Sequence, residues 1–514
     1  MTHRSTSLAL LVALAATPAL AQDEAPRGLI RNEPGALDGY TLFTPLRGRE
    51  THLIDMEGEI VATWESEWLP GQSVYLLPNG NLLRCCRAEN RIFSGGGEGG
   101  RLAEYDREGN LVWEYVCSDE SRRQHHDAEP LPNGNVLLIA WEIVSRDGAL
   151  ALGRDEELLG TGHWWPDCVL EVKPTPPKGG EIVWEWHAKD HLIQDRDPEK
   201  PNHGDPAAHP ERIDVNADAF SLGDAGAGPM TKAEEERLRA LGYVGGDDDR
   251  GRRAGRDRGR GRRDRRSDWM HTNSVAYNAA LDQIVLSVKT LGEIWIIDHG
   301  TTTEEAAGPK GDLLYRWGNP AAWSAGPVGE RRLFGQHDAR WVRSGDGWNL
   351  TVYNNGRGRP EGDWSSVDEI ALPLAADGTY RRAPGRPFGP ESLVWTYAGT
   401  EDDRFYSSFI SGAERLPNGN TLVCVGEKGE VFEVTRDGEV VWEWHCPIAG
   451  REPGPGGDRP PRGDGPPPGD RPPPDRAGGG RPGGHSPYGL FRATRIPKDA
   501  PALAGWSLGE RKSF

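Results

Sequence analysis

The amino-acid sequence predicts an all-β protein, a six-bladed β-propeller with two long disordered insertions. Three observations favour this fold. The chain of 514 residues contains 19 Trp although only 36% of it is hydrophobic, which suits many short strands with large cross-strand side chains better than packed helices. One phrase recurs six times along the chain, and a second phrase recurs three times. Such repetition is typical of modular β architectures.

The first phrase is a turn followed by a strand that ends in Trp or another aromatic residue. It occurs at residues 55–64, 106–115, 179–186, 311–318, 390–397 and 437–444. Apolar strands precede several copies, for example residues 293–298 and 430–435. We therefore expect an outer β-hairpin in each of six modules.

The second phrase, Leu-Pro-Asn-Gly-Asn, occurs at residues 77–81, 131–135 and 416–420, each time between apolar stretches. Asn-Gly is the strongest short signal for a hairpin, so this phrase predicts an inner hairpin. Two hairpins make a four-stranded sheet, and six such sheets around an axis make a propeller, in which neighbouring blades cover the sheet edges.

Two insertions interrupt the repeats. Residues 190–268 combine a Pro/His/Asp-rich part, an expected short helix at 232–243 and an Arg-rich run at 250–266. Because this composition cannot bury a core, we expect a partly disordered, solvated loop and no nucleic-acid site. Residues 449–484 are a Pro/Gly-rich linker. Residues 486–497 then contain a final strand that would pair with the first blade and close the ring.

The chain begins with a segment typical of a secretory signal peptide. Residues 1–21 hold Arg4, an apolar run and small residues before Gln22, so we expect cleavage after Ala21 and a periplasmic or secreted propeller over 22–514. The apolar run is too short to span a bilayer, and no membrane anchor is expected. The formal charge of −19 argues against a general nucleic-acid or anionic-membrane binder. The pairing of the six cysteines stays open: Cys85, Cys86, Cys117, Cys168, Cys424 and Cys446.

Three histidines fall at similar positions of the predicted inner strands. Counting back seven residues from the turn Asn gives His126 and His271, and the Gln336-His337-Asp338 segment repeats His125-His126-Asp127. Inner strands line the channel of a propeller, so these side chains should converge at one mouth of it. His126, His271 and His337 are therefore the candidate site, and His125 is the reserve for His126 because adjacent strand residues face opposite sides.

Hairpin arithmetic places partners beside this cluster. It pairs Lys289 with His271, Trp141 with His126, and Asn354 or Asn355 with His337, and it puts Asn273 on the same strand face as His271. One cation beside three imidazoles predicts an anion pocket.

At these residues the sequence resembles a known family, the bacterial PAPS-independent arylsulfate sulfotransferases. The resemblance rests on His271-Thr-Asn273-Ser-Val, Val285-Leu-Ser-Val-Lys289, Gln336-His337-Asp-Ala and residues 490–496. It implies a six-bladed periplasmic propeller that passes a sulfuryl group between phenols through a sulfohistidine. By this resemblance His337 is the nucleophile, and His126, His271 and Asn273 support it. The family usually has Arg where Lys289 stands, which changes the hydrogen-bonding geometry but not the charge.

The chemistry of sulfuryl transfer agrees with such a site. Like phosphoryl transfer, it needs positioned donors and cations around a loose transition state, and a neutral imidazole can act as the nucleophile. No cofactor is needed, and the chain has no P-loop for a nucleotide donor. The expected partners are an aryl sulfate donor and a phenolic acceptor, and the oligomeric state stays open. Two alternatives remain, a His-ligated metalloenzyme, which Lys289 opposes by repelling a cation, and a non-catalytic secreted binding propeller.

Overall fold

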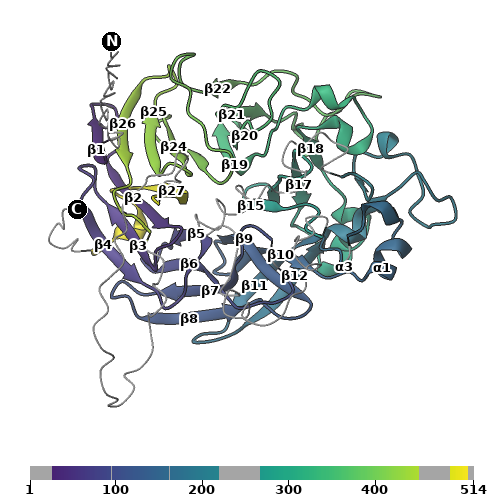
Figure 1. Ribbon diagram of the computed structural model, residues 1–514, viewed down its shortest axis with the longest axis horizontal. Coiled ribbons are helices and arrows are strands. Elements are labelled where there is room, and N and C mark those ends of the chain that lie inside the picture. Colours follow the sequence, from purple (N-terminus) through teal and green to yellow (C-terminus); the bar gives the residue numbers. More distant parts are fainter. Residues whose placement is uncertain (1–25, 94, 161–162, 219–266, 451–486, 507–514) are drawn as a thin grey trace, which may run out of the picture.

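The structure, a computed structural model, describes residues 26–93, 95–160, 163–218, 267–450 and 487–506. It confirms the predicted fold, because six sheets of four or five strands lie around a common centre as a β-propeller (Figure 1). The predicted signal peptide, the short helix at 232–243, the Arg-rich run and most of the 449–484 linker lie outside the described residues.

In each blade the strands follow one another from the centre of the ring outward. Blade 1 contains β27 (Leu490–Pro497), β2 (Gly39–Pro45), β3 (Glu50–Ile54) and β4 (Ile60–Glu65). Blade 2 contains β5 (Pro70–Leu76), β6 (Leu82–Arg87), β7 (Gly100–Tyr105) and β8 (Leu111–Val116). Blade 3 contains β9 (Arg122–Pro130), β10 (Val136–Glu142), β11 (Asp167–Pro174) and β12 (Gly180–His187).

The second half of the ring has the same arrangement. Blade 4 contains β15 (Thr272–Asn278), β16 (Gln283–Val288), β17 (Glu293–Asp298) and β18 (Tyr315–Trp317). Blade 5 contains β19 (His337–Ser344), β20 (Gly347–Asn354), β21 (Ser366–Ala371) and β22 (Trp395–Tyr397). Blade 6 contains β23 (Gly412–Arg415), β24 (Thr421–Val425), β25 (Glu430–Val434) and β26 (Val440–His445), with β1 (Gly28–Asn32) on its outer edge.

Both repeated phrases occupy the same place in each blade where they occur. The aromatic phrase forms the fourth strand, as in β8 and β26, and Leu-Pro-Asn-Gly-Asn is the turn between the first and second strands, as between β9 and β10. The strands within the six blades pair antiparallel. The innermost strands contact one another around the ring, from β5 through β9, β15, β19 and β23 to β27.

The recurring Trp of the outer strands links each blade to the next. Its indole Nε1–H donates to a backbone carbonyl in the turn that opens the next aromatic phrase, at 2.7–3.0 Å. The six pairs are Trp64 with Asp106, Trp113 with Gly179, Trp186 with Gly311, Trp317 with Pro390, Trp395 with Arg436, and Trp442 with Met56. The last pair joins blade 6 to blade 1, so an indole N–H hydrogen bond connects each blade to the next around the whole ring.

The end of the chain completes the first blade. β27 pairs antiparallel with β2, from Gly39 opposite Pro497 to Pro45 opposite Leu490. Figure 1 shows this yellow strand beside the purple strands from the start of the chain. The innermost strand of blade 1 is therefore supplied by residues more than 400 positions away from the other three, which closes the sheet ring.

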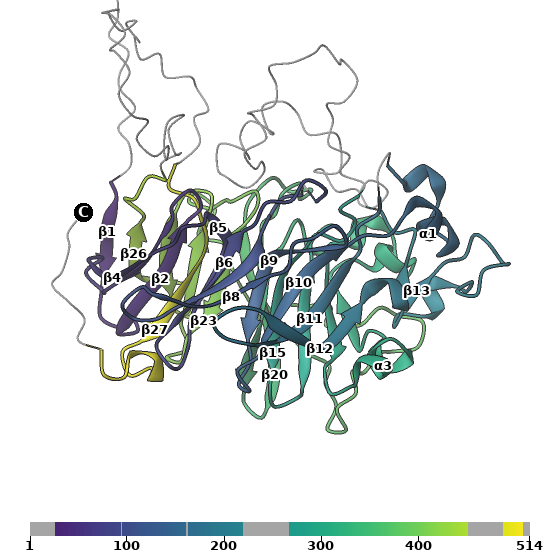
Figure 2. The ribbon, with the colours of Figure 1, turned by 90° about the horizontal axis from the view of Figure 1, so that it is seen from below.

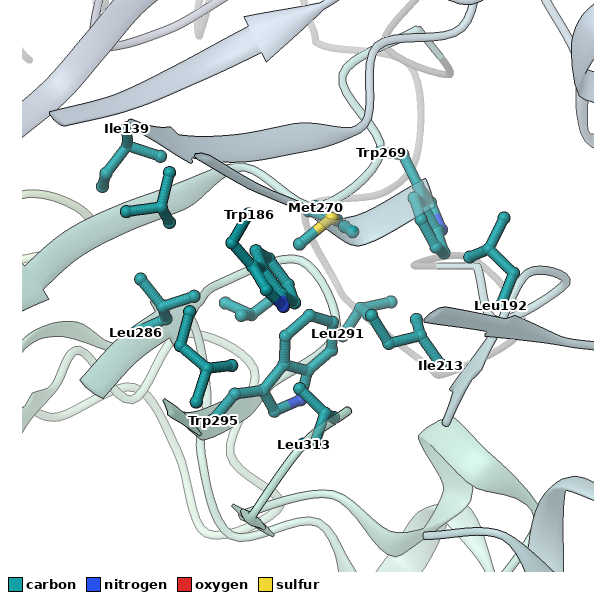
Figure 3. Close-up of a cluster of buried hydrophobic side chains, with 14 of the residues drawn as sticks. Ile139, Trp186, Leu192, Ile213, Trp269, Met270, Leu286, Leu291, Trp295 and Leu313 are labelled. Atoms are coloured by element: carbon teal, nitrogen blue, oxygen red, sulfur yellow. The ribbon is translucent and has the colours of Figure 1, made fainter. Parts of the chain in front are cut away.

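Residues 190–218 and 267–268, the described part of the insertion predicted over 190–268, are structured. β13 (Leu192–Ile193) and β14 (Ile213–Asp214) pair in parallel, and Leu192 and Ile213 are buried in a hydrophobic cluster with Trp186, Trp269 and Trp295 (Figure 3). This cluster joins blades 3 and 4. The segment is ordered because it covers apolar surface that these two blades leave open.

The short helices lie outside the sheets. Figure 2 shows α1 (Arg146–Ala151), α3 (Thr303–Ala306) and β13 near one edge of the molecule. The 3-10 helices are η1 (Glu156–Leu158), η2 (Ala188–His191), η3 (Pro206–Ala208), η5 (Pro309–Gly311), η6 (Pro320–Trp323), η7 (Val328–Glu330) and η8 (Pro501–Leu503). Within the described ranges, no helix has the length and apolarity to cross a bilayer. All six cysteines lie in those ranges as buried free thiols.

Candidate functional site

The three predicted histidines lie on the innermost strands of three successive blades. His126 is in β9, His271 directly precedes β15, and His337 begins β19. The imidazole rings of His126 and His271 are 4.6 Å apart between centroids and nearly perpendicular. We call His126, His271 and His337 the histidine cluster.

A strained backbone position recurs on these strands. Gln72, His126, His271, Asp338 and Ser411 have left-handed φ values of 98°, 52°, 50°, 56° and 87° in blades 2 to 6, and in blade 6 the preceding Ile410 is left-handed as well, with φ 52°. Residues other than Gly adopt such values only where the surrounding structure holds them, and functional sites are where they cluster.

The third histidine departs from the predicted register by one residue. In blades 3 and 4 the left-handed residue is the histidine itself, whereas in blade 5 it is Asp338 and His337 precedes it. The three imidazoles therefore reach the centre of the ring from two backbone positions.

His337 is fully buried, and its Nδ1 atom is anchored. Nδ1 lies 2.8 Å from Asn355 Oδ1 and 3.0 Å from the Gly335 carbonyl, two acceptors that require Nδ1 to carry the proton. The Asn355 orientation is set because its Nδ2 donates to the carbonyls of Ser407 and Ile410. Nε2 is therefore unprotonated in the neutral ring, where it accepts the Ile410 N–H at 3.2 Å.

His271 is anchored by a carboxylate. Its Nδ1 lies 2.5 Å from Asp268 Oδ2, and the other oxygen of Asp268 accepts the indole N–H of Trp141 at 2.9 Å. Asp268 thus fixes the same tautomer as in His337, with the proton on Nδ1.

His126 is anchored by its neighbour in sequence. His125 Nδ1 and His126 Nδ1 are 2.8 Å apart, and His125 Nε2 is 3.3 Å from Asp167 Oδ1. All three residues are buried. His125, predicted only as a reserve for His126, therefore belongs to the site together with it, and Asp167 lies behind both.

Burial and the local charges keep the cluster neutral. Burial lowers the pKa of His337 to about 3, with the Lys289 ammonium and His271 lowering it further. Burial also lowers the pKa of His126 well below its usual value and lowers the pKa of His271. Lys289 contributes to all three shifts. One ammonium group is therefore close enough to act electrostatically on every member of the cluster.

The predicted position of Lys289 agrees with the strand register. Thr272 pairs with Val288, so Lys289 and His271 are the next residues along the same ladder. Asn273 is fully buried, and its Nδ2 donates to the Gln336 carbonyl at 2.8 Å, next to His337.

Two other predicted pairings are wrong. Trp141 pairs with Arg123 and not with His126, because the ladder between β9 and β10 shifts register at Leu138–Ala140. His337 pairs with Tyr353 and not with Asn354 or Asn355. Asn355 nevertheless reaches His337 through its side chain, and Trp141 stacks on His125 with ring centroids 4.1 Å apart.

Sequence reasoning missed the residue that ties the cluster strands together. Arg492 of β27 forms ion pairs with Asp127 at 2.8 Å and with Asp338 at 3.1 Å, and it donates to the Asn273 carbonyl at 3.2 Å. Asp127 follows His126, and Asp338 follows His337. The repeated His-Asp dipeptide was the available signal, because two buried carboxylates need a common cation.

A glycine allows the chain to lie against His126. Gly97 has φ +77°, and a Cβ atom on it would lie 2.1 Å from His126 Nε2. The Gly97 carbonyl also accepts the His126 N–H at 2.8 Å. Any side chain at position 97 would displace the imidazole, so the glycine-rich run beginning at residue 95 is part of the site.

The donor atoms do not form a metal site. Among the residues that the structure describes, no three His, Cys, Asp or Glu side chains are arranged to hold a metal ion. The site instead offers three neutral imidazoles, one ammonium group and a buried amide, an arrangement suited to an anionic group with several oxygens.

Comparison with known proteins identifies relatives of the chain. The family model for arylsulfotransferase (ASST) matches residues 47–371. The arylsulfate sulfotransferase AssT of Escherichia coli O6:H1 is 25% identical over 409 residues, which cover 75% of this chain and 58% of that protein. The chain therefore spans less than two thirds of the length of this relative.

The solved structures that match the chain are more distant. A protein of unknown function from Bacteroides caccae is 12% identical, with a TM-score of 0.38 over 79% of this chain and 93% of that chain. Virginiamycin B lyase from Staphylococcus aureus is 10% identical, with a TM-score of 0.33 over 83% and 87%. The family match covers well over half of the chain, and the protein belongs to the arylsulfotransferase (ASST) family.

Proposed function

We propose that this protein transfers a sulfuryl group from an aryl sulfate ester to a phenol, with His337 as the nucleophile and a sulfohistidine as the intermediate. The observation that carries the proposal is the His337 imidazole, buried, fixed with its proton on Nδ1, and with a pKa lowered to about 3 chiefly by burial. Its Nε2 is therefore unprotonated at neutral pH, and attack on sulfur requires its lone pair to leave the hydrogen bond with the Ile410 N–H. Family membership and the AssT relative support the reaction type.

In the first half-reaction, the His337 Nε2 lone pair forms a bond to sulfur. The bond from sulfur to the phenolic oxygen breaks, and its electron pair stays on the phenolic oxygen, which takes a proton from a neighbouring imidazole. We expect Lys289 and the second Nδ2–H of Asn273, whose first is donated to the Gln336 carbonyl, to bind the sulfuryl oxygens as charge develops on them. In the second half-reaction an acceptor phenol gives up its proton and takes the sulfuryl group from His337.

Lys289 gives the proposed site a particular character. An ammonium group is a point charge without the planar fork of Arg, so it attracts sulfuryl oxygens without fixing two of them in one plane. Burial is the main cause of the lowered pKa of His337, and the hydrogen bond with Asn355 raises that pKa. The charge of Lys289 lowers it further and so helps to keep the nucleophile unprotonated.

We also propose that the protein acts after export. The signal-peptide features of residues 1–21 support this, and N-terminal sequencing of the mature protein tests the expected cleavage after Ala21.

The proposed function is tested by initial rates with 4-nitrophenyl sulfate as donor and phenol as acceptor. We expect phenyl sulfate as a product, and parallel lines in double-reciprocal plots when both concentrations are varied, because the donor product leaves before the acceptor binds. Intersecting lines would show that donor and acceptor are bound together before a product leaves, which contradicts the ping-pong order. Binding of the donor without any transfer would indicate a non-catalytic binding propeller. Activity that is lost with a chelator and restored by a metal would indicate a metalloenzyme.

A further inference from the structure

Behind His126 lies a chain of buried groups that the proposed transfer step has not used. His126 contacts His125 through the two Nδ1 atoms at 2.8 Å, and His125 Nε2 faces Asp167 Oδ1 at 3.3 Å. Among the described residues, neither of those last two atoms makes a hydrogen bond, so each buried atom has the other as its facing polar group. The other Asp167 oxygen accepts the Thr272 N–H at 2.8 Å, which fixes the carboxylate in place.

The His125 ring lies between an aromatic face and a carboxylate. Its face is stacked on Trp141, with centroids 4.1 Å apart and planes 12° apart, and Asp167 faces its Nε2. An aromatic face and a carboxylate both stabilise an imidazolium. His126, by contrast, contacts His271 and has Lys289 close to it, and burial together with these groups lowers its pKa well below the usual value.

We infer that Asp167 and His125 form a proton relay behind His126, and that His126 delivers the relayed proton to the phenolic oxygen of the donor. This inference rests on the proposed function and names the acid of its first half-reaction. His126 is the catalytic residue of the relay, and His125 and Asp167 act through it.

The protons in this relay balance. In the proposed resting state, His125 carries protons on both nitrogens, with Nδ1–H donated to His126 and Nε2–H facing Asp167 at 3.3 Å, and neutral His126 carries its proton on Nε2. As the bond from sulfur to oxygen breaks, the Nε2 proton of His126 moves to the phenolate. The Nδ1 proton of His125 then moves to His126 Nδ1, which leaves both rings neutral. The acceptor phenol reverses both transfers in the second half-reaction.

The relay explains how a neutral imidazole can serve as the acid. A positive charge on buried His126 is unfavourable because Lys289 lies close to it. A proton held on His125 lies one residue away, and the negative charge of Asp167 balances it. General acid catalysis contributes most when the leaving group is a strong base. The relay should therefore matter for phenyl sulfate and little for 4-nitrophenyl sulfate, whose leaving group is stable as the anion.

The experiment compares Asp167→Asn and His125→Gln with the wild-type full chain, using both donors and one acceptor. We expect kcat/KM with phenyl sulfate to fall by about 10²-fold or more, and with 4-nitrophenyl sulfate to fall less than about threefold. Adding Asp167→Asn to His126→Ala should cause no further loss with phenyl sulfate, because the two residues act in one chain. Equal losses with both donors, or full additivity with His126→Ala, would overturn the relay.

The chain offers a matched control. His191 and Asp312 form another buried pair, with Nδ1 and Oδ1 2.8 Å apart and the ring stacked on Trp186, outside the histidine cluster. Asp312→Asn should leave the ratio of the two donor rates at its wild-type value. A change of that ratio as large as in Asp167→Asn would show that loss of any buried His–Asp pair causes it, and would overturn the relay.

A measurement on the wild-type protein does not depend on the folding of variants. The rate with phenyl sulfate in mixtures of H₂O and D₂O should curve as expected for two protons in motion, whereas a straight line indicates one proton and contradicts the relay. Failure of the proposed function can be told apart from failure of the relay. If His337 is not the nucleophile, His337→Asn keeps its transfer activity, independently of the results with Asp167→Asn and His125→Gln.

Discussion

The two halves of the ring use the same backbone device for different purposes. Blades 3, 4 and 5 place imidazoles at or next to the left-handed position of the inner strand, whereas blades 2 and 6 place Gln72 and Ser411 there. Ser411 Oγ is used within its own blade, where it accepts the Gly426 N–H at 2.9 Å. The propeller thus supplies an equivalent strained position in five blades, and the residue type decides which of them can do chemistry.

The half of the ring without a cluster histidine still supports the other half through one residue. Arg492 enters from blade 1 and forms ion pairs with the carboxylates that follow His126 and His337. The candidate site is therefore assembled only when the last strand of the chain has closed the ring. This difference between reactive and supporting blades leads to four predictions, beginning with the largest effect.

Arg492→Met should be the most damaging change outside the cluster. It removes the ion-pair partner of buried Asp127, whereas Asp338 keeps its ion pair with Arg340 at 2.8 Å. Removing one partner of a buried ion pair costs about 3–5 kcal/mol of the free energy of unfolding. Denaturant unfolding followed by Trp fluorescence measures this loss. Turnover should also fall by about 10²-fold, because small displacements of reacting groups have effects of that size. An active variant of wild-type stability would show that the two halves are independent.

Lys289→Met should lower turnover with an aryl sulfate by about 10²–10³-fold, as expected for the loss of a preorganised oxyanion donor. Thermal stability should stay close to wild type. Lys289→Arg should retain or improve activity, because its fork can bind two sulfuryl oxygens at once. If the Met variant turns over at the wild-type rate, Lys289 does not contact the sulfuryl group.

The cluster should make the protein less stable in acid. When the pH falls from ~6.5 toward ~3, buried His337 with its pKa near 3 stays neutral in the folded protein, whereas the same histidine binds a proton in the unfolded chain. The free energy of unfolding is therefore unaffected by this group above pH ~6.5, and between pH ~6.5 and pH ~3 it falls by about 1.4 kcal/mol per pH unit.

This pH effect can be isolated with variants. Between pH 6 and pH 4, the free energy of unfolding of His337→Asn should fall less steeply than that of the wild type, by about 1.4 kcal/mol per pH unit. Replacement of the exposed His209 by Asn should leave the slope unchanged. Identical slopes in wild type and His337→Asn would mean that His337 is protonated in the folded protein.

Gln72→Leu should have the smallest effect, and in the opposite direction. Both polar atoms of the Gln72 side chain are buried without a hydrogen-bond partner among the described residues. Replacing an unsatisfied amide with an apolar group of similar size should raise the free energy of unfolding by about 1 kcal/mol. A raised KM for the acceptor in this variant would instead place Gln72 in the substrate site.

The sequence was sufficient to predict the ring and much of the cluster. The aromatic phrase identified the outer strands because each Trp must both fill the space between blades and hydrogen-bond to the next blade, and this requirement repeats in every blade. The Asn-Gly turns fixed the inner hairpins, and the ladder of Thr272 with Val288 placed Lys289 beside His271 as expected.

The missing parts of the site depend on irregular pairing and on contacts between blades. The arithmetic for Trp141 assumed an unbroken ladder, but β9 and β10 shift register beside the left-handed His126. Asp167, Asp268 and Arg492 reach the cluster from a different strand, a loop and a different blade. Such contacts leave no periodic signal in a single sequence.

The proposed nucleophile is tested most directly by the mass of the intact protein after incubation with an aryl sulfate and no acceptor. The wild-type protein should gain the mass of one sulfuryl group, located on His337 by peptide sequencing, and should lose it when phenol is added. His337→Asn should gain nothing, while His209→Asn labels as the wild type does. A label that persists in His337→Asn, or a wild-type protein that turns over without ever carrying one, would contradict transfer through His337.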